Sequence, residues 1–369
     1  MYGSIFGNIY RFSTWGESHG KAIGAVVDGC PAGVPLCEDD IQKFLDRRKP
    51  GQSRFTTQRK EADQVEILSG IFEGKTTGTP ISMIVRNTDQ RSRDYSEIAE
   101  YYRPGHADLN YDIKYGFRDY RGGGRSSGRE TIGRVAAGAV ASRVLKELGI
   151  SINAYTRSIG PVSVSPERFS LEEASQNALY MPDAEAAQTA SEYLNTCMKE
   201  TDSSGGVVEC IIRGVPAGIG EPAFEKLDAA LAKAIISIGA VKGFEIGEGM
   251  SAASLKGSQN NDAYRMDENG NIVKKTNHSG GITGGLSDGS PIVLRAAFKP
   301  TPSIAARQET VNRSGENIEI SIKGRHDPII VPRAVVVVES MAAAVILDAM
   351  LGSMTSRMDR IKKFFDIPE

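Results

Sequence analysis

Cysteine is scarce in this chain of 369 residues, and the four that occur are too scattered to form a recognisable metal site. Cys30, Cys37, Cys197 and Cys210 form no CxxC pair, and no His-x-His pair accompanies them. Zinc sites draw on closely spaced cysteines and histidines, so this pattern argues against a bound zinc ion. Isolated cysteines of this kind are typical of reduced thiols, and they predict a cytoplasmic protein.

Aromatic residues and excess charge are also in short supply. Phe, Trp and Tyr make up 7% of the chain, Trp occurs once, and the formal net charge is −2. Proteins that bind single-stranded nucleic acid stack bases on aromatic rings and carry a basic surface. The composition therefore disfavours a nucleic-acid-binding module, although arginines are clustered locally.

No hydrophobic run is long enough to span a membrane. The densest one, residues 334–338, is ended by Glu339, far short of the roughly 18 residues that a spanning helix needs. The first seven residues, MYGSIFG, lack the basic start and apolar stretch of a secretory signal. With 40% hydrophobic and 24% charged residues, the composition predicts a soluble globular protein.

Glycine, by contrast, is abundant, with 40 residues concentrated between short apolar runs. The hydrophobic spacing predicts helices over residues 38–48, 130–148, 185–198, 225–236 and 335–351. It predicts strands over residues 22–27, 80–85, 207–212, 292–296 and 318–322. Because no proline- or serine-rich linker divides this mixture, we expect a single α+β domain over residues 1–369.

The two halves of the chain contain similar segments. DGCPAGV at residues 28–34 resembles RGVPAGI at 213–219, and the Gly/Pro/Ile pattern of residues 70–81 recurs without a gap at 281–292. Gly-Pro turns can resemble each other by chance, and the two shifts differ, which excludes a strict tandem repeat. The alternative is a pseudo-twofold arrangement of two related layers, each a sheet faced by helices.

Three of the four histidines lie in short polar motifs: GESHG around His19, RPGHAD around His106 and GRHDP around His326. Histidine exchanges protons near neutral pH, arginine binds phosphate and carboxylate, and glycine lets the backbone approach a ligand. These motifs predict one anion-binding site with proton chemistry, assembled from distant parts of the chain. His278, in NHS, is predicted to be an ordinary loop histidine.

The segment RDYRGGGRSSGRET at residues 118–131 has the composition of a phosphate-binding loop. Its three glycines expose backbone N–H groups, and its serines can cap the helix predicted to follow. The alternative is a surface loop with solvated arginines. The segment lacks the lysine of a nucleotide P-loop and the preceding strand of a dinucleotide-binding fold. Residues 69–76 lack the first glycine of a P-loop, so we predict a turn between strands there.

Two further basic segments are candidates for binding anions. RRKPGQSR at residues 47–54 follows a predicted helix, where basic residues often only complement the helix dipole. Its glycine, serine and glutamine are more typical of a loop that clasps a ligand. KPTPS at residues 299–303 follows a strand and combines a lysine with hydroxyl groups on a stiff backbone.

Taken together, these motifs resemble the signatures of the chorismate synthase family. The three histidine motifs and residues 122–129 occur in that family's order, and residues 46–48, 240–243 and 299–303 agree as well. The resemblance implies a β-α-β sandwich and a homotetramer. It also implies an anti 1,4-elimination of phosphate from 5-enolpyruvylshikimate 3-phosphate that gives chorismate, the last step of the shikimate pathway. The family requires reduced FMN, which lends electron density to the breaking C–O bond.

The resemblance also implies roles for individual residues. His19 would protonate the departing phosphate, His106 would set the protonation state of the flavin pyrimidine edge, and Asp327 would manage the proton at flavin N5. Substrate anions would be held by Arg48, Arg54, Arg103 and Arg129, of which Arg48 and Arg54 are also candidates for a nicotinamide phosphate. The FMN-contact positions would be Arg125, Ser126, Ser127, Gly239, Ala240, Gly284, Lys299, Pro300, Thr301, Pro302, Ser303 and Arg325.

At two positions the chain departs from the family pattern: Gly239 stands where Asn is frequent, and Pro302 where Ser is frequent. Both lack a side-chain donor, so contacts there would be made by backbone or shape. The competing interpretation is a flavin- or NADPH-dependent reductase of an anionic substrate, which would consume its reductant stoichiometrically. Since no reductase-like domain or NADPH fingerprint is visible, we expect an external source of reduced flavin.

Overall fold

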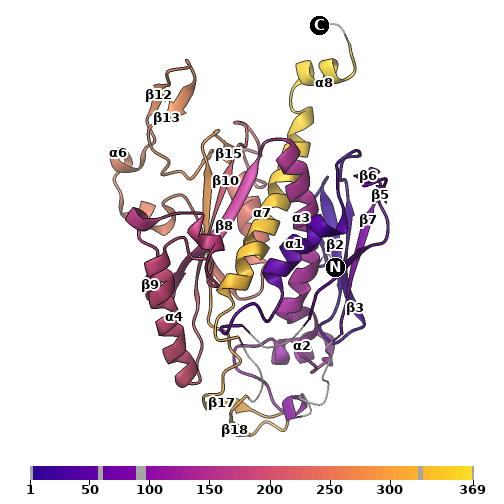
Figure 1. Cartoon of the computed structure of the whole chain (residues 1–369), viewed down its shortest axis with the longest axis vertical. Helices are drawn as coiled ribbons and strands as arrows, with labels where there is room; N and C mark the ends of the chain where they lie inside the picture. Colours follow the sequence, from indigo (N-terminus) through magenta and orange to yellow (C-terminus); the bar gives the residue numbers. More distant parts are fainter. Residues whose placement is uncertain (1–2, 57–60, 89–96, 323–326, 368–369) are drawn as a thin grey trace.

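The computed structural model describes residues 3–56, 61–88, 97–322 and 327–367. They form two antiparallel five-stranded sheets with helices between and around them (Figure 1), which confirms the α+β class. The conformation of each element follows from its local sequence, as the following paragraphs describe.

The first sheet has the order β1-β2-β3-β7-β4, and every neighbouring pair is antiparallel. Its strands are β1 (Ile5–Phe6), β2 (Arg11–Gly16), β3 (Ala22–Asp28), β7 (Ile81–Arg86) and β4 (Val65–Ile67). Along β7, buried Ile81, Met83 and Val85 alternate with more exposed residues, because successive side chains point to opposite faces of a sheet. The buried face is turned toward the helices.

The second sheet has the order β11-β16-β10-β8-β9 and is antiparallel throughout. Its strands are β11 (Val241–Ile246), β16 (Ile292–Phe298), β10 (Gly206–Arg213), β8 (Ser151–Ile159) and β9 (Val162–Ser163). Strand β16 alternates strictly, with Ile292, Leu294, Ala296 and Phe298 buried. The central strands therefore each present one apolar face to the core.

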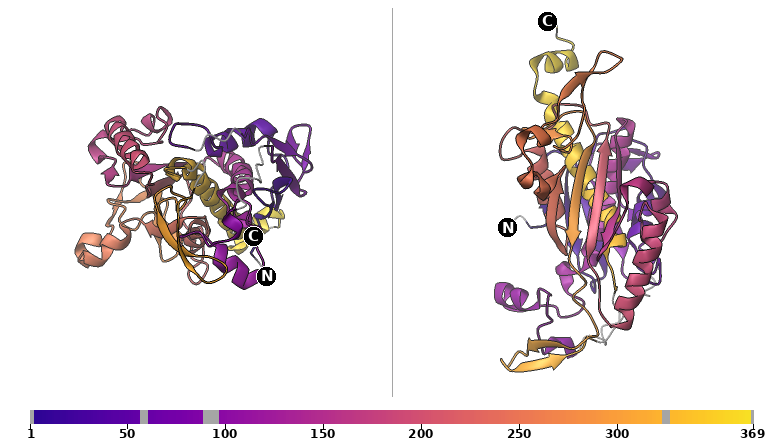
Figure 2. Two further views of the ribbon diagram at one scale, coloured as in Figure 1. Left: turned by 90° about the horizontal axis from the view of Figure 1, so that it is seen from below. Right: turned by 90° about the vertical axis from the view of Figure 1, so that its left-hand side faces the viewer.

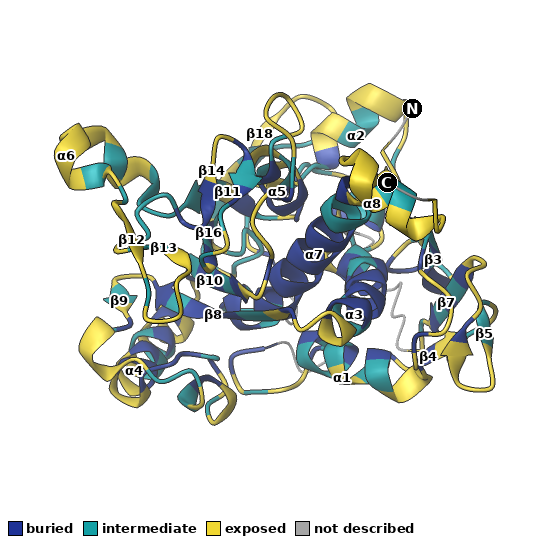
Figure 3. Ribbon diagram, turned by 90° about the horizontal axis from the view of Figure 1, so that it is seen from above, coloured by how far each residue is buried: buried dark blue, intermediate teal, exposed yellow. Residues whose placement is uncertain are grey.

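Two long helices, α3 (Thr131–Glu147) and α7 (Val331–Gly352), lie between the sheets (Figure 3). Small residues let them pack closely: a Cβ added at Gly138 would lie 2.2 Å from the Cβ of Ser340. Helices α1 (Glu38–Arg48) and α5 (Leu227–Ile236) pack against this pair. The stretch Val331–Thr355 is long and apolar enough to cross a membrane, but 78% of its apolar window is buried, as expected of a core helix.

The remaining described elements are short or peripheral. Hairpins are formed by β5 (Ile71–Phe72) with β6 (Lys75–Thr76), β12 (Tyr264–Met266) with β13 (Ile272–Lys274), β14 (Ile282–Thr283) with β15 (Leu286–Ser287), and β17 (Gln308–Val311) with β18 (Asn317–Ile320). The other helices are α2 (Asp108–Tyr115), α4 (Ala184–Lys199), α6 (Gly257–Asn260) and α8 (Met358–Phe364). Helix α8 projects from the body in Figure 1 and in the right view of Figure 2.

All five predicted helices and all five predicted strands are present, with ends shifted by a few residues. The segment rejected as a P-loop is the β5–β6 hairpin, a turn between strands as predicted. The sequence did not predict β2, β8 or β11, because Thr, Ser, Arg, Lys and Gly interrupt their apolar residues.

Candidate functional site

A buried group of charged side chains lies where α1 ends and α3 begins. Arg48, the last residue of α1, is paired with Asp63 at 3.4 Å, and both side chains are almost completely buried. Arg129, in the turn before α3, is paired with Asp63 at 3.1 Å and with Glu61. Segments from three parts of the chain thus place two guanidinium groups and two carboxylates within one desolvated cluster.

Burial destabilises the charged form of the Arg48 guanidinium and lowers the pKa of Arg48 to about 10. The loss of water, together with the charges of Arg333 and Arg129, outweighs the attraction of Asp63 and Glu61. Within the described residues, Nε, Nη1 and Nη2 of Arg48 have no hydrogen-bond partner of good geometry. Unsatisfied buried donors are costly, and an anionic ligand is the group best suited to satisfy them.

Asp327 joins this cluster through Arg333, in the first turn of α7. Arg333 donates through Nη1 to Asp327 Oδ2 at 2.7 Å and through Nε to the backbone oxygen of Arg48 at 3.0 Å. The carboxylate predicted to handle a proton is therefore held beside the buried arginines. Arg325 and His326, from the same motif, lie outside the described residues.

His19 lies in the turn between β2 and β3, and its side chain is buried. Ser18 Oγ donates to the backbone oxygen of Gly122 at 3.3 Å and lies 3.1 Å from His19 Nδ1. Since the hydroxyl proton goes to Gly122, Nδ1 donates to the serine oxygen, and this tautomer assigns proton exchange to Nε2. A Cβ at Gly122 would lie 2.3 Å from His19 Cε1, so only glycine permits this approach.

Asn87 connects the histidine turn to the arginine cluster. Its Nδ2 donates to the backbone oxygens of Glu17 at 3.0 Å and Gly20 at 2.8 Å, on either side of His19. Its Oδ1 accepts from Arg129 Nη2 at 2.7 Å. One amide group therefore fixes the relative position of His19 and Arg129.

Replacing Asn87 by alanine is expected to lower kcat by about 10²-fold, because a displacement of about 1 Å in a catalytic group can have that effect. Asn87→Asp keeps an acceptor for Arg129 but loses both donors to the turn, so a kcat as low as that of the alanine variant would assign the effect to His19. Asn271→Ala, at an exposed turn held through Asp267, serves as the control. Unchanged kcat in both Asn87 variants would contradict this assignment.

The RPGHAD motif forms a second buried group. Arg103 donates to Asp108 through Nε at 2.8 Å and Nη2 at 2.7 Å, a two-point contact at the start of α2. His106 Nε2 lies 2.9 Å from Ser303 Oγ, and Lys299 Nζ donates to the backbone oxygen of Gly105 at 2.7 Å. The 299–303 segment thus packs directly on the RPGHAD motif. A Cβ at Gly123 would lie 3.9 Å from Arg103 Nη2, which places this group beside the glycine-rich loop and His19.

His106 is held in its neutral form. Burial and the nearby charge of Arg103 lower the pKa of His106 to about 4. Its Nδ1 lies 3.0 Å from the backbone oxygen of Pro104, which can only accept, so Nδ1 carries the proton and Nε2 accepts from Ser303. At neutral pH this side chain presents no positive charge to the site.

The depressed pKa of His106 predicts a pH-dependent loss of stability. Between about 6.5, the ordinary histidine pKa, and about 4, the unfolded chain binds the extra proton more readily than the folded one. Neutral His106 therefore contributes up to about 3 kcal/mol to the free energy of unfolding. This contribution is fully present above pH 6.5 and is lost as the pH falls through 4. Urea unfolding at pH 7 and at pH 4.5 should show that the free energy of unfolding falls less in His106→Gln than in the parent chain. An equal fall in both chains would refute the lowered pKa of His106.

The arginines of the glycine-rich loop have different partners. Arg118 is bound to Asp112 at 2.8 Å and Arg121, at the surface, to Asp119 at 2.8 Å. Arg125 turns inward and donates to Thr14 Oγ1 at 2.6 Å. Ser127 Oγ accepts from the backbone N–H of Arg129, the capping contact predicted for this loop, and Ser126 Oγ donates to the backbone oxygen of Gly123 at 2.7 Å. The alternative of uniformly solvated arginines is therefore wrong.

Some of the other predicted residues make few contacts with the site or lie away from it. The Arg54 side chain is exposed and lies over the Phe55 ring, 4.7 Å from its centroid. Gly239 is exposed, but Ala240 accepts a hydrogen bond from the backbone N–H of Lys299 at 3.0 Å. Gly284 lies in the β14–β15 hairpin before β16, whereas Lys299 follows β16, so the seven-residue strand, roughly 20 Å long, separates them.

Comparisons with known proteins identify the family of this chain. The sequence profile of the chorismate synthase family matches residues 10–351. The chain belongs to this family. It is 68% identical to a chorismate synthase of Agathobacter rectalis over 99% of both chains, and 65% identical to one of Lachnoclostridium phytofermentans over 99% of this chain and 100% of the other. A crystal structure of chorismate synthase superposes with a TM-score of 0.77 at 35% identity, covering 98% of this chain and 97% of that one.

Proposed function

We propose that this site catalyses the family's reaction, the anti 1,4-elimination of phosphate from 5-enolpyruvylshikimate 3-phosphate to give chorismate. The chain is accordingly a carbon–oxygen lyase of aromatic amino-acid biosynthesis. The observation that carries the proposal is the convergence of His19, Arg129, Arg48 and Asp327 through Asn87, Asp63 and Arg333. A polyanionic substrate matches a desolvated cluster of arginines beside a buried histidine.

Within this site the arginines would hold the substrate's phosphate and carboxylates. Arg48 and Arg129 are presented by rigid helix ends, which limits the entropy lost on binding. Arg103 uses Nε and Nη2 on Asp108, so it would bind an anion through Nη1. Arg54, exposed at the surface, would contact substrate only at the edge of the site, and a nicotinamide phosphate at Arg48 and Arg54 stays a prediction.

His19 Nε2 would deliver a proton to the departing phosphate, which makes it a better leaving group. The imidazolium that gives up this proton would be stabilised beforehand by Asp119, and the step leaves His19 neutral with its remaining proton on Nδ1. The pKa of Asp119 is lowered chiefly by Arg121 and also by the charge of His19, so the two groups interact electrostatically. Asp327, oriented by Arg333, would exchange a proton through its carboxylate oxygens. His106, neutral, would orient the Ser303 hydroxyl without adding positive charge to the site.

The residues present fit a bound FMN. Burial, and after it the nearby charge of Lys242, lower the pKa of Lys299, as expected of cations gathered for a phosphate. Thr301 Oγ1 is buried and has no hydrogen-bond partner within the described residues. When bound, reduced FMN would supply electron density to the breaking C–O bond. Lys299, Thr301, Ser303, Arg125 and Ala240 are the residues we expect to hold it.

Replacing Lys299 by methionine is expected to weaken FMN binding by roughly 10- to 100-fold, since a hydrogen bond to a charged group contributes about 1.5–3 kcal/mol. Thr301→Val, which preserves shape but removes the buried hydroxyl, should weaken it by a smaller factor. Lys146→Met, at the exposed end of α3, is the matched control. Flavin fluorescence titration measures each Kd; parent-like affinity in both variants would place FMN elsewhere.

An anaerobic assay tests the reaction. The chain is supplied with 5-enolpyruvylshikimate 3-phosphate and catalytic dithionite-reduced FMN, then with oxidised FMN and NADPH, and chorismate absorbance is followed. Many turnovers per flavin are expected in the first arm. Turnover limited to one per reductant would indicate the reductase instead. Chorismate in the second arm would show that the chain reduces FMN itself, whereas we expect dependence on an external flavin reductase.

Four broader proposals accompany the reaction. We infer a pseudo-twofold between the halves, supported by matching orders of four strands in each sheet: β2-β3-β7-β4 corresponds to β8-β10-β16-β11, with a hairpin before β7 and before β16. We also propose one domain over residues 1–369, a homotetramer and a cytoplasmic location, the last supported by four free cysteines. Superposition of the two sheets and mass measurement in solution test the first and third of these.

A further inference from the structure

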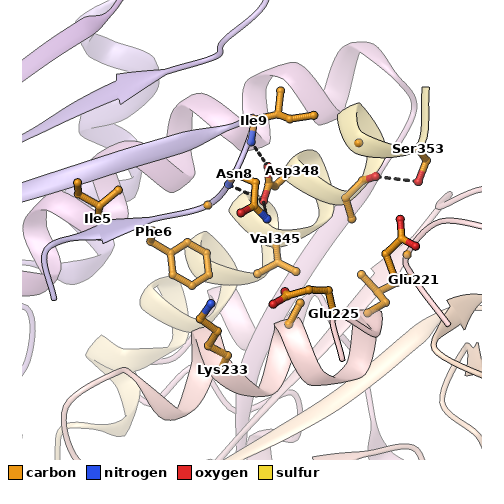
Figure 4. A pocket seen from close by; sticks show the side chains of 16 residues that line it. Ile5, Phe6, Asn8, Ile9, Glu221, Glu225, Lys233, Val345, Asp348 and Ser353 are labelled. Atoms are coloured by element: carbon orange, nitrogen blue, oxygen red, sulfur yellow. Dashed lines mark hydrogen bonds between the residues drawn. The ribbon is translucent and has the colours of Figure 1, made fainter. Parts of the chain in front are cut away.

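A pocket of about 220 Å³ lies far from the site, at the C-terminal end of α7. Its walls are the N-terminal segment 5–9, the first turns of α5 and the last turns of α7 (Figure 4). The N-terminal wall is firmly held, because Asp348 of α7 accepts from the backbone N–H groups of Ile9 at 2.7 Å, Asn8 at 2.9 Å and Tyr10 at 3.0 Å.

The pocket combines an apolar lining with an acidic rim. Phe6, Leu227 and Val345 contribute apolar surface, and Figure 4 shows Glu221 and Glu225 around the hollow. Lys233 is the lining residue of opposite charge. With Asp348 occupied by backbone donors, the two glutamates remain to attract a basic ligand. Such a pocket is suited to an aromatic or aliphatic side chain carried on a basic segment.

The chain itself contains a segment of that kind. Residues 354–367, here called the C-terminal arm, contain four basic and two acidic residues. None of the side chains of α8 is buried, and Phe364 and Phe365 are 72% and 64% exposed. Figures 1 and 2 show that the arm projects from the body. Adjacent exposed aromatic rings on a protruding helix mark an interaction surface.

We infer that the C-terminal arm of one copy of this chain binds in the pocket of a second copy, and that two copies exchange arms. The arm directly follows Gly352 and Ser353, which themselves line the pocket. A twofold axis near these residues would therefore bring each arm to its neighbour's pocket. The arm projects beyond the end of α7 (Figure 1), and helical turns continue into it, since Ser353 Oγ donates to the Ala349 oxygen at 2.8 Å and Ser356 Oγ to the Ser353 oxygen at 2.7 Å.

Relatives of this chain also contain the two segments. The chorismate synthase of Agathobacter rectalis matches 99% of this chain, and a chorismate synthase crystal structure covers 98% of it. The inference rests on the proposed self-association, but not on the reaction.

Cross-linking between differently substituted copies tests the exchange. In a Cys37→Ser background, which removes the exposed native thiol, Phe365→Cys and Ile5→Cys chains are mixed and treated with a short bifunctional maleimide. A covalent heterodimer is expected, and adding Phe364→Glu to the arm partner should reduce its yield at least tenfold. Phe72→Cys, equally exposed on the β5–β6 hairpin, replaces Ile5→Cys as the control and should give no such product.

The results of this experiment distinguish the exchange of arms from the proposed homotetramer. A doubly substituted single chain that cross-links only within itself would show the arm folding back on its own pocket and overturn the exchange. Absence of the heterodimer in a sample whose mass in solution is that of a tetramer would overturn the exchange alone. A monomeric mass at assay concentration would overturn both.

Discussion

His19→Ala is expected to lower kcat by roughly 10²- to 10⁴-fold, the usual contribution of a positioned general acid. The prediction depends on the tautomer set by Ser18 and Gly122, which directs Nε2 to proton exchange. Because the imidazole acts on the leaving phosphate rather than on substrate affinity, KM should change much less than kcat. Steady-state kinetics with saturating reduced FMN separates the two parameters.

A matched control comes from the loop histidine. His278 is partly exposed, and its Nδ1 lies 2.8 Å from Glu248, in a loop far along the chain from the proposed site. His278→Ala should therefore keep parent-like kcat. His19→Gln, which preserves volume and a donor but cannot exchange a proton near neutral pH, should be as slow as the alanine variant. Near-normal rates in both His19 variants would refute the general-acid role.

Local patterns in the sequence predicted elements well because local chemistry determines them. Helix α1 begins with Glu38, Asp39 and Asp40 and ends with Arg47 and Arg48, which complement the helix dipole, and its predicted ends match the structure. In contrast, β8 pairs with β10 although its sequence, SINAYTRSI, mixes polar and apolar residues. Its strand conformation follows from tertiary packing, which overrides weak local preference.

The site was predicted in part for the same reason. Histidines, arginines and glycines in dense motifs are visible locally, and the fold brings most of them together. Glu61, Asp63 and Asn87 were missed because each lies in an unremarkable segment and acts through partners 15 to 70 positions away. Of these three residues, only Asn87 has a sequence feature that could have marked it as a site residue: it is polar and comes directly after a buried strand. The sequence also did not reveal that Gly284 lies away from Lys299, because this depends on the tertiary structure, in which the two residues lie at opposite ends of β16.

The largest stability effect is expected from Arg48→Ala. Removing this guanidinium leaves the buried Asp63 carboxylate without one of its two cations, and breaking a buried ion pair in this way typically costs 3–5 kcal/mol, so we expect a loss of about 3–5 kcal/mol in the free energy of unfolding. Arg11→Ala, which breaks the exposed pair with Asp28, is the control and should cost at most about 1 kcal/mol. Urea unfolding at one protein concentration measures both.

A second variant distinguishes charge from packing at the same position. Arg48→Met combined with Asp63→Asn removes both charges and leaves Arg129 paired with Glu61, so stability should recover by well over half relative to Arg48→Ala. Activity should not recover, because the double variant lacks a group that would bind the substrate's anions. Recovered stability with lost turnover is the expected combination. A double variant that is as unstable as Arg48→Ala would refute the charge argument, because Arg48→Met keeps most of the side-chain volume and Asp63→Asn removes the carboxylate that would be left unpaired.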